Sequence, residues 1–94
     1  MNLLDQIASK IISEQELVIG PLAWSEAKKV PGLTIDMQTH QATISDAQPT
    51  LVVDKLVAQY ERLFGRASQE VCREAVASML SSFAPADIPL SLRA

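Results

Sequence analysis

The spacing of the apolar residues changes twice along this chain of 94 residues, and the changes limit the folds that it can adopt. Residues 3–30 and 49–83 carry apolar side chains three or four positions apart, as amphipathic helices do. Between them, residues 33–45 alternate apolar and polar side chains, which is typical of strands with one buried face. The pattern predicts a single α+β domain over residues 1–94, in which N-terminal helices precede a β-hairpin and an antiparallel helical hairpin.

The N-terminal part has two possible divisions. A helix is predicted over residues 3–12, where apolar rows at spacing four form one stripe and Asp5 falls away from it. The segment Ser13–Glu16 matches a capping box, so either a second helix starts there or the first continues to about residue 18. A glycine–proline pair then interrupts the pattern. Because proline suits the first position of a helix, another helix is predicted from Pro21 to about Val30. Its predicted inward residues are Leu22, Ala23, Ala27 and Val30.

The alternating segment predicts two short strands joined by a loop of about four residues without glycine. A two-stranded hairpin is marginally stable alone, and the edges of a sheet expose unpaired backbone groups. The C-terminal tail or a second chain is therefore expected to complete the sheet. The residues predicted on its apolar face are Leu33, Ile35, Met37, Ala42 and Ile44.

The third helix is predicted over Pro49–Phe64, with Gly65 as its stop. Ser68 is expected to cap a fourth helix that runs to about Phe83. Because the connection has only three or four residues, the two helices should lie antiparallel. Their predicted inner faces consist of Val53, Leu56, Val57, Tyr60, Leu63 and Phe64 in the third helix, and of Cys72, Ala75, Val76, Met79, Leu80 and Phe83 in the fourth.

The tail, residues 84–94, contains two prolines and is predicted to be extended rather than helical. Ile88, Leu90 and Leu92 alternate with other residues at strand spacing. Burying each of these side chains stabilises a fold by roughly 1.5–3 kcal/mol. The tail is therefore expected to dock, either on its own domain, where it can add a third strand, or on a partner.

Charge and composition exclude several classes of protein. The formal net charge is −3, and eight basic residues spread along an acidic chain are a poor basis for binding nucleic acid. One cysteine allows no intrachain disulfide. No apolar run approaches the ~20 residues of a membrane span, and the N-terminus does not look like a signal peptide. A cytoplasmic protein is expected, without nucleic-acid or membrane partners.

The residues that most often carry chemistry lack companions here. His40 is the only histidine, and its predicted place is an exposed hairpin tip. Cys72 lies near a helix start and next to Arg73, both of which lower a thiol pKa, but its position on the apolar stripe favours the core. No nucleophile–base pair and no set of metal ligands is visible. The chain is expected to be neither an enzyme nor a cofactor- or metal-binding protein.

Two groups of residues are candidates for binding. Free N–H groups at a helix start beside arginines can hold a phosphate or carboxylate, which makes the Gly65–Ser68 turn a candidate anion site. Trp24 is either a core residue, which we favour, or an anchor for a partner. The candidate anion-site residues are Arg62, Arg66, Ser68 and Arg73, and the candidate interface residues are Trp24, Ile88, Leu90 and Leu92.

Two stretches resemble small uncharacterised proteins of cyanobacterial type. The stretches run from Gly32 through Gly65 and from Glu70 to Val76, and the resemblance covers about half of the chain. It includes no motif with a known mechanism, so it implies no functional residue. It favours a bacterial cytoplasm as the location.

These observations favour a protein–protein interaction module, most simply a homodimer in which two hairpins pair into a four-stranded sheet. The alternative is a regulatory domain that binds an anion or a small ligand at the Gly65–Ser68 turn. A third hypothesis is an enzyme that uses Cys72.

Overall fold

The structure is a computed structural model that describes residues 3–84 and 88–92. Its first element is a single long helix, α1. The helix predicted for residues 3–12 continues without a break to Ile19, so the capping-box segment lies inside the helix. Gln15 in that segment is buried and donates from its amide to the Ser68 carbonyl oxygen at 3.0 Å. The elements are α1 (Leu3–Ile19), α2 (Leu22–Ala27), β1 (Leu33–Asp36), β2 (Gln41–Ile44), α3 (Pro49–Phe64) and α4 (Ala67–Val76).

Helix α2 is shorter than predicted because the chain tightens into turns before Pro31. The Val30 N–H donates to the Ala27 carbonyl, three residues back, instead of continuing the α-helical pattern. Ala27 and Val30 are buried as predicted. Leu22 is exposed, so its inward placement was wrong; it is the first residue of the helix, and burial begins at the next residue, Ala23.

The two strands form the predicted antiparallel hairpin, with Leu33 opposite Ile44 and Ile35 opposite Ala42. Gly32 precedes β1 with a φ of +83°, and a Cβ atom there would lie 2.9 Å from a Val52 methyl group, so this position requires glycine. Met37 is 43% exposed, which contradicts its predicted inward position. The reason is that β1 ends at Asp36 and the following residues form the turn.

Helix α3 begins and ends where the sequence predicts, and Gly65 follows it with a φ of +88°. Its buried stripe includes Val52 as well as the predicted residues up to Tyr60. Leu63 and Phe64 are exposed, contrary to prediction, because they lie in a last turn beyond Tyr60, the final buried residue of the helix.

Helix α4 differs from the prediction at both ends. Ser68 is a buried residue inside the helix and not its cap. The helix stops at Val76 instead of Phe83, and the chain continues through a short 3₁₀ turn at Leu80–Ser82. Ser81 Oγ donates to the Ser78 carbonyl oxygen at 3.1 Å, and local side-chain bonds of this kind compete with the helix. Met79, Leu80 and Phe83 nevertheless pack against the core.

The described part of the tail docks on its own domain, but not as a strand. Residues Leu90–Leu92 form a 3₁₀ turn, and Leu92 is buried while Leu90 is 66% exposed. The N–H and hydroxyl of Ser91 donate to Asp54 Oδ1 of α3, at 2.9 and 2.6 Å. The prediction of docking is confirmed, whereas the third-strand alternative is wrong for these residues. Residues 85–87 and 93–94 of the predicted tail lie outside the described residues.

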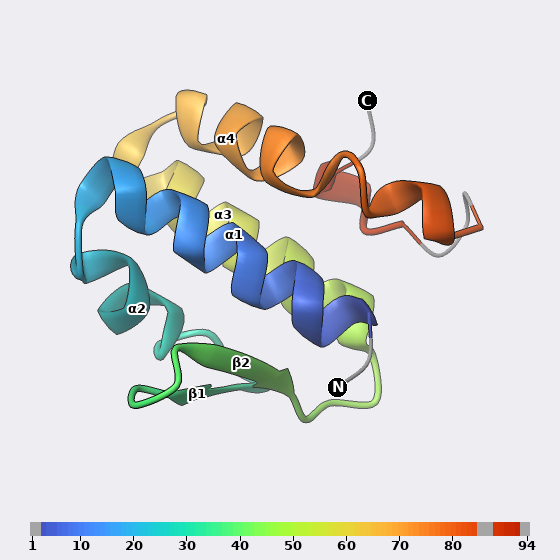
Figure 1. The fold of residues 1–94 in the computed structure, drawn as a ribbon, viewed down its shortest axis with the longest axis horizontal. Helices are drawn as coiled ribbons and strands as arrows, with labels where there is room; N and C mark the ends of the chain where they lie inside the picture. Colours follow the sequence, from blue (N-terminus) through green and yellow to red (C-terminus); the bar gives the residue numbers. More distant parts are fainter. Residues whose placement is uncertain (1–2, 85–87, 93–94) are drawn as a thin grey trace.

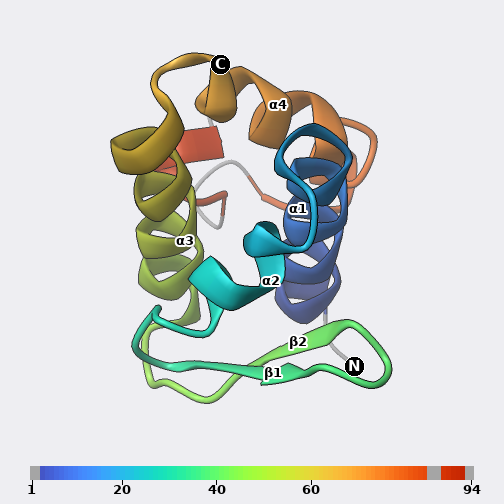
Figure 2. The ribbon, with the colours of Figure 1, turned by 90° about the vertical axis from the view of Figure 1, so that its left-hand side faces the viewer.

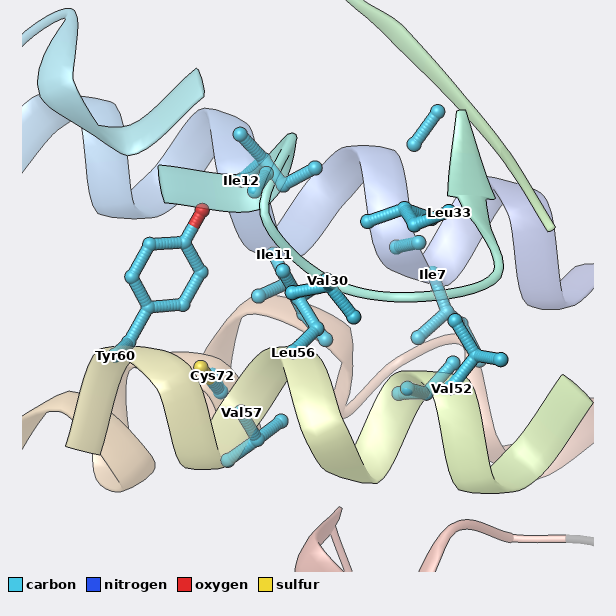
Figure 3. Packing of buried hydrophobic residues seen from close by; sticks show 14 of the residues in the cluster. Ile7, Ile11, Ile12, Val30, Leu33, Val52, Leu56, Val57, Tyr60 and Cys72 are labelled. Atoms are coloured by element: carbon cyan, nitrogen blue, oxygen red, sulfur yellow. The ribbon is translucent and has the colours of Figure 1, made fainter. Parts of the chain in front are cut away.

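The helices form a three-sided enclosure that the hairpin closes (Figures 1 and 2). Helices α1 and α3 lie side by side as walls, and α4 lies above them. Helix α4 runs in the direction opposite to α3, which confirms the predicted antiparallel helical hairpin. The hairpin closes the opposite side, and α2 fills the end between the walls. The core lies between these elements (Figure 3), where Tyr60 points its hydroxyl toward α2 and donates to the Ala23 carbonyl at 2.7 Å.

Candidate functional site

The hairpin directs two sets of backbone groups outward, one from each strand. The Ser45 N–H donates to the Gly32 carbonyl at 2.8 Å. This bond determines which residue pairs along the hairpin are hydrogen-bonded to each other and which direct their backbone groups outward. Pairs such as Thr34–Thr43 bond to each other across the hairpin, whereas Ile35 and Ala42 direct their N–H and C=O groups away from it. Each strand therefore has an outer edge whose hydrogen bonds must be met elsewhere or by solvent.

The outer edge of β2 is closed by two side chains of α1. Asp5 Oδ1 accepts from the Ile44 N–H at 2.8 Å. Ser9 Oγ accepts from the Ala42 N–H at 2.9 Å and lies 3.5 Å from the Ala42 carbonyl oxygen, to which it donates. Figure 1 shows β2 as the strand next to α1. Helix α1 thus occupies the place of a neighbouring strand.

The outer edge of β1 has no such cover. The Leu33 N–H is engaged by the Val30 carbonyl at 3.2 Å. Within residues 3–84 and 88–92, the Ile35 N–H and C=O have no hydrogen-bond partner in the structure. Thr34 and Asp36 are exposed on the sheet face away from the core. The hairpin therefore has one closed edge and one open edge.

The sequence did not predict the roles of Asp5 and Ser9. Asp5 was expected to point away from the apolar stripe, but it is only 6% exposed and lies over the hairpin. The available signal was their spacing, because two polar residues four apart on a helix share a face. That signal does not identify a sheet edge as the partner.

His40 and Trp24 come together at the hairpin tip, which was also not predicted. The two rings stack with centroids 4.6 Å apart and an interplanar angle of 15°. His40 is exposed, as predicted for a turn residue, and has a φ of +54°. Trp24 is 1% exposed, which confirms its favoured core position. In this chain the indole forms part of the core under the hairpin tip rather than a surface anchor.

The candidate interface residues of the tail are not all accessible. Ile88 is partly buried and Leu92 is buried, so only Leu90 presents most of its side chain to solvent. The same tail segment is tied to α4 by Gln69, whose amide donates to the Ser91 carbonyl at 3.3 Å. The tail therefore acts within the described chain as part of the fold.

The four residues of the candidate anion site do not converge. Arg66 and Arg73 line one shallow hollow at the start of α4, where Arg73 is paired with Glu70 at 2.7 Å. Ser68 is buried and does not line that hollow. Arg62 lines a different hollow, on the far side of α3, and donates to Gln59 Oε1 at 2.7 Å.

Cys72 is a core residue, as its position on the stripe predicted. Its side chain is fully buried and accepts a hydrogen bond from the Gln15 amide at 3.3 Å. Burial raises the pKa of the thiol to about 11, which outweighs the opposing effect of that hydrogen bond. At neutral pH the group is therefore a thiol and not the nucleophilic thiolate.

Among the described residues, no group of three or more His, Cys, Asp and Glu side chains is placed to hold a metal ion. No helix in the part of the chain that the structure describes is long and apolar enough to cross a membrane. Comparisons with protein-family models, with curated proteins and with solved structures each found no match.

Proposed function

We propose that this chain is a self-association module in which two copies pair through the open edge of β1. The observation that carries the proposal is the difference between the two edges of the hairpin. Asp5 and Ser9 of α1 close the β2 edge, while the outward N–H and C=O of Ile35 lack a partner among the described residues. An open edge is a template for another strand. Pairing of two β1 edges gives a four-stranded sheet.

The free groups of β1 favour one register. Antiparallel pairing centred on Ile35 lets its N–H and C=O bond reciprocally to Ile35 of the second copy. The carbonyl of Leu33 then faces the N–H of Met37 in the second copy. The Leu33 N–H can keep its bond to the Val30 carbonyl, because this contact between the copies uses only the Leu33 carbonyl. Thr34 lies opposite Asp36 of the second copy in this register. A shift that placed the two Asp36 side chains opposite each other would bring like charges together.

A second copy fits this edge because the edge complements itself. An isologous contact of this kind closes after two chains and leaves β2 and β2 of the second copy at the outside, where α1 of each copy protects them. Pairing also covers part of Met37, which is exposed beside the seam. The result is a closed dimer with no further open strand edge in its sheet.

The test is sedimentation velocity over a wide range of protein concentration, with two variants of Ile35. Ile35→Pro removes the outward N–H and should leave a folded monomer, because proline is tolerated on edge strands. Ile35→Val keeps the N–H and serves as the matched control, which should still dimerise. A wild-type chain that stays monomeric at millimolar concentration overturns the proposal, as does a dimer that Ile35→Pro leaves intact.

A further inference from the structure

A small hollow of about 250 Å³ lies between α3 and the segment that connects α2 to β1. Val30, Pro31 and Ala58 supply apolar surface. Three basic side chains stand around that surface, and Gln59 completes the lining. The basic residues are Lys29, Lys55 and Arg62.

The charge of this hollow is opposite to that of the chain. Three of the eight basic residues of a chain with net charge −3 line it, and no carboxylate does. The carboxylate that bonds to the lining is Glu26, which is 7% exposed and accepts from Lys29 and Gln59. Three cations and one carboxylate leave a net charge of +2. Lys55 and Arg62 have no ion-pair partner among the described residues.

Glu26 also holds the lining in place. Its Oε2 accepts from Lys29 Nζ at 2.9 Å, and its Oε1 accepts from Gln59 Nε2 at 2.9 Å. Gln59 Oε1 in turn accepts from Arg62 Nη2 at 2.7 Å. These bonds keep the pKa of Glu26 below its ordinary value, chiefly through Lys29. A buried carboxylate and one amide thus hold Lys29 and Arg62 at the hollow before any ligand arrives. For Arg62, this lowers the entropy cost of binding a ligand.

We propose that this hollow binds a small organic phosphate, with the phosphate between Lys55 and Arg62 and a short apolar group against Pro31 and Ala58. The net charge of +2 matches a phosphate dianion, and guanidinium and ammonium groups are the usual phosphate ligands in proteins. The volume lies just below the usual range for drug-sized ligands, so the apolar group must be small. The lining of the hollow includes no residue of β1, and binding there does not depend on dimer formation.

The test is a backbone NMR titration of the full chain with three probes at millimolar concentration. Phenyl phosphate carries both parts of the proposed ligand, inorganic phosphate only the head, and benzyl alcohol only the apolar body. We expect phenyl phosphate to shift the signals of residues 29–31 and 55–62 and to bind more tightly than either of the others. Inorganic phosphate that binds as tightly as phenyl phosphate overturns the role of the apolar surface.

Three matched variants test the role of the charges. Arg62→Gln and Lys55→Gln should each weaken binding of phenyl phosphate about tenfold, as loss of a charged hydrogen bond does. Lys28→Gln removes the same charge from an exposed neighbour that does not line the hollow and should have little effect. Equal weakening by all three variants, or shifts spread over every lysine, shows non-specific attraction and overturns the proposal. The three substituted side chains are exposed at the surface. Each variant is verified to fold by a spectrum that matches the wild-type spectrum at residues away from the substitution.

Discussion

The two edges of the hairpin differ in the hydrogen bonding of their outward backbone groups. Both strands direct backbone groups outward, and on β2 the Ile44 N–H and both backbone groups of Ala42 are bonded, by Asp5 and Ser9 of α1. On β1 the corresponding groups of Ile35 lack a partner within the described residues. A strand edge can therefore be closed inside one chain by helix side chains, without a third strand. The asymmetry between the edges, rather than the hairpin as a whole, indicates where a second chain can pair.

The closure of β2 depends on the similar spacing of side chains along α1 and of outward backbone groups along β2. Residues four apart on an α-helix rise by about 6 Å, and residues two apart on a strand by about 7 Å. Asp5 and Ser9 are four apart, and their targets Ile44 and Ala42 are two apart on an antiparallel course. The similar spacing lets two short side chains of one helix reach two successive outward groups of one strand. No comparable pair of side chains faces β1 among the described residues.

The largest effect is expected when the closed edge is opened. Asp5→Ala removes a carboxylate acceptor from the partly buried Ile44 N–H and should lower the free energy of unfolding by about 2–3 kcal/mol. Ser9→Ala should cost about 1 kcal/mol. Urea denaturation measures both. Ser13→Ala, at an exposed position of the same helix, is the control and should change stability by less than about 0.5 kcal/mol. If Asp5→Ala costs no more than this control, the closure of β2 does not stabilise the fold.

A smaller effect is expected from charge on the open edge. In the proposed register Thr34 lies opposite Asp36 of the second copy, at two symmetric places. Thr34→Glu should therefore weaken the dimer, and Thr34→Lys should strengthen it, with a difference of about tenfold in dissociation constant. Sedimentation equilibrium gives both constants.

The matched control for this charge reversal lies on the neighbouring strand. Thr43→Glu and Thr43→Lys place the same charges on the same exposed face of β2, away from the proposed seam. Their dimer constants should agree with each other within about twofold, since exposed charges far from a contact are screened. An equal response at Thr34 and Thr43 would show that net charge, and not the register, controls association.

The smallest effect is expected at the turn that joins the two edges. Asp36 Oδ1 accepts from the N–H groups of Gln38 and Thr39, at 2.9 and 3.2 Å, and these bonds lower the pKa of the carboxyl group. A carboxyl with a lowered pKa in the folded state stabilises the fold at neutral pH and loses that contribution as the pH falls through the folded value. Asp36→Asn keeps an acceptor but cannot titrate.

The measurement is the thermal midpoint of both chains from neutral pH to about pH 3. The wild type should lose more stability than Asp36→Asn below about pH 4, and the two curves should run parallel above it. Curves that stay parallel over the whole range would show that Asp36 is not specifically stabilised in its charged form.

Features set by local sequence were predicted well. The bounds of α3 follow from Pro49 and Gly65, and the strands follow from the alternation of residues 33–36 and 41–44. Errors cluster where local and tertiary requirements differ. Leu63 and Phe64 continue an apolar stripe past the end of the core and remain exposed.

The candidate sites were harder to predict because they join distant segments. Asp5 and Ser9 act on residues more than thirty positions away, and the stack of His40 on Trp24 likewise joins a turn to a helix. Arg62 was grouped with its neighbours in sequence, but the helix directs it to Gln59 and to the hollow beside Lys29. A pattern of residue types predicts which face of a helix or strand is buried and where the element ends. It does not predict which side chain from a distant part of the sequence contacts that face or end.

The most direct test of the open edge is an intermolecular nuclear Overhauser effect in a sample that mixes isotope-labelled and unlabelled chains. In antiparallel pairing centred on Ile35, the Hα atoms of Thr34 and of Asp36 in the second copy come into close contact across the seam. We predict an intermolecular cross-peak between these two Hα atoms, together with none from the Hα atoms of Gln41 and Thr43, which lie on the β2 edge that α1 closes. A dimer without the Thr34–Asp36 cross-peak, or with cross-peaks from β2 instead, would contradict the assignment of β1 as the open edge.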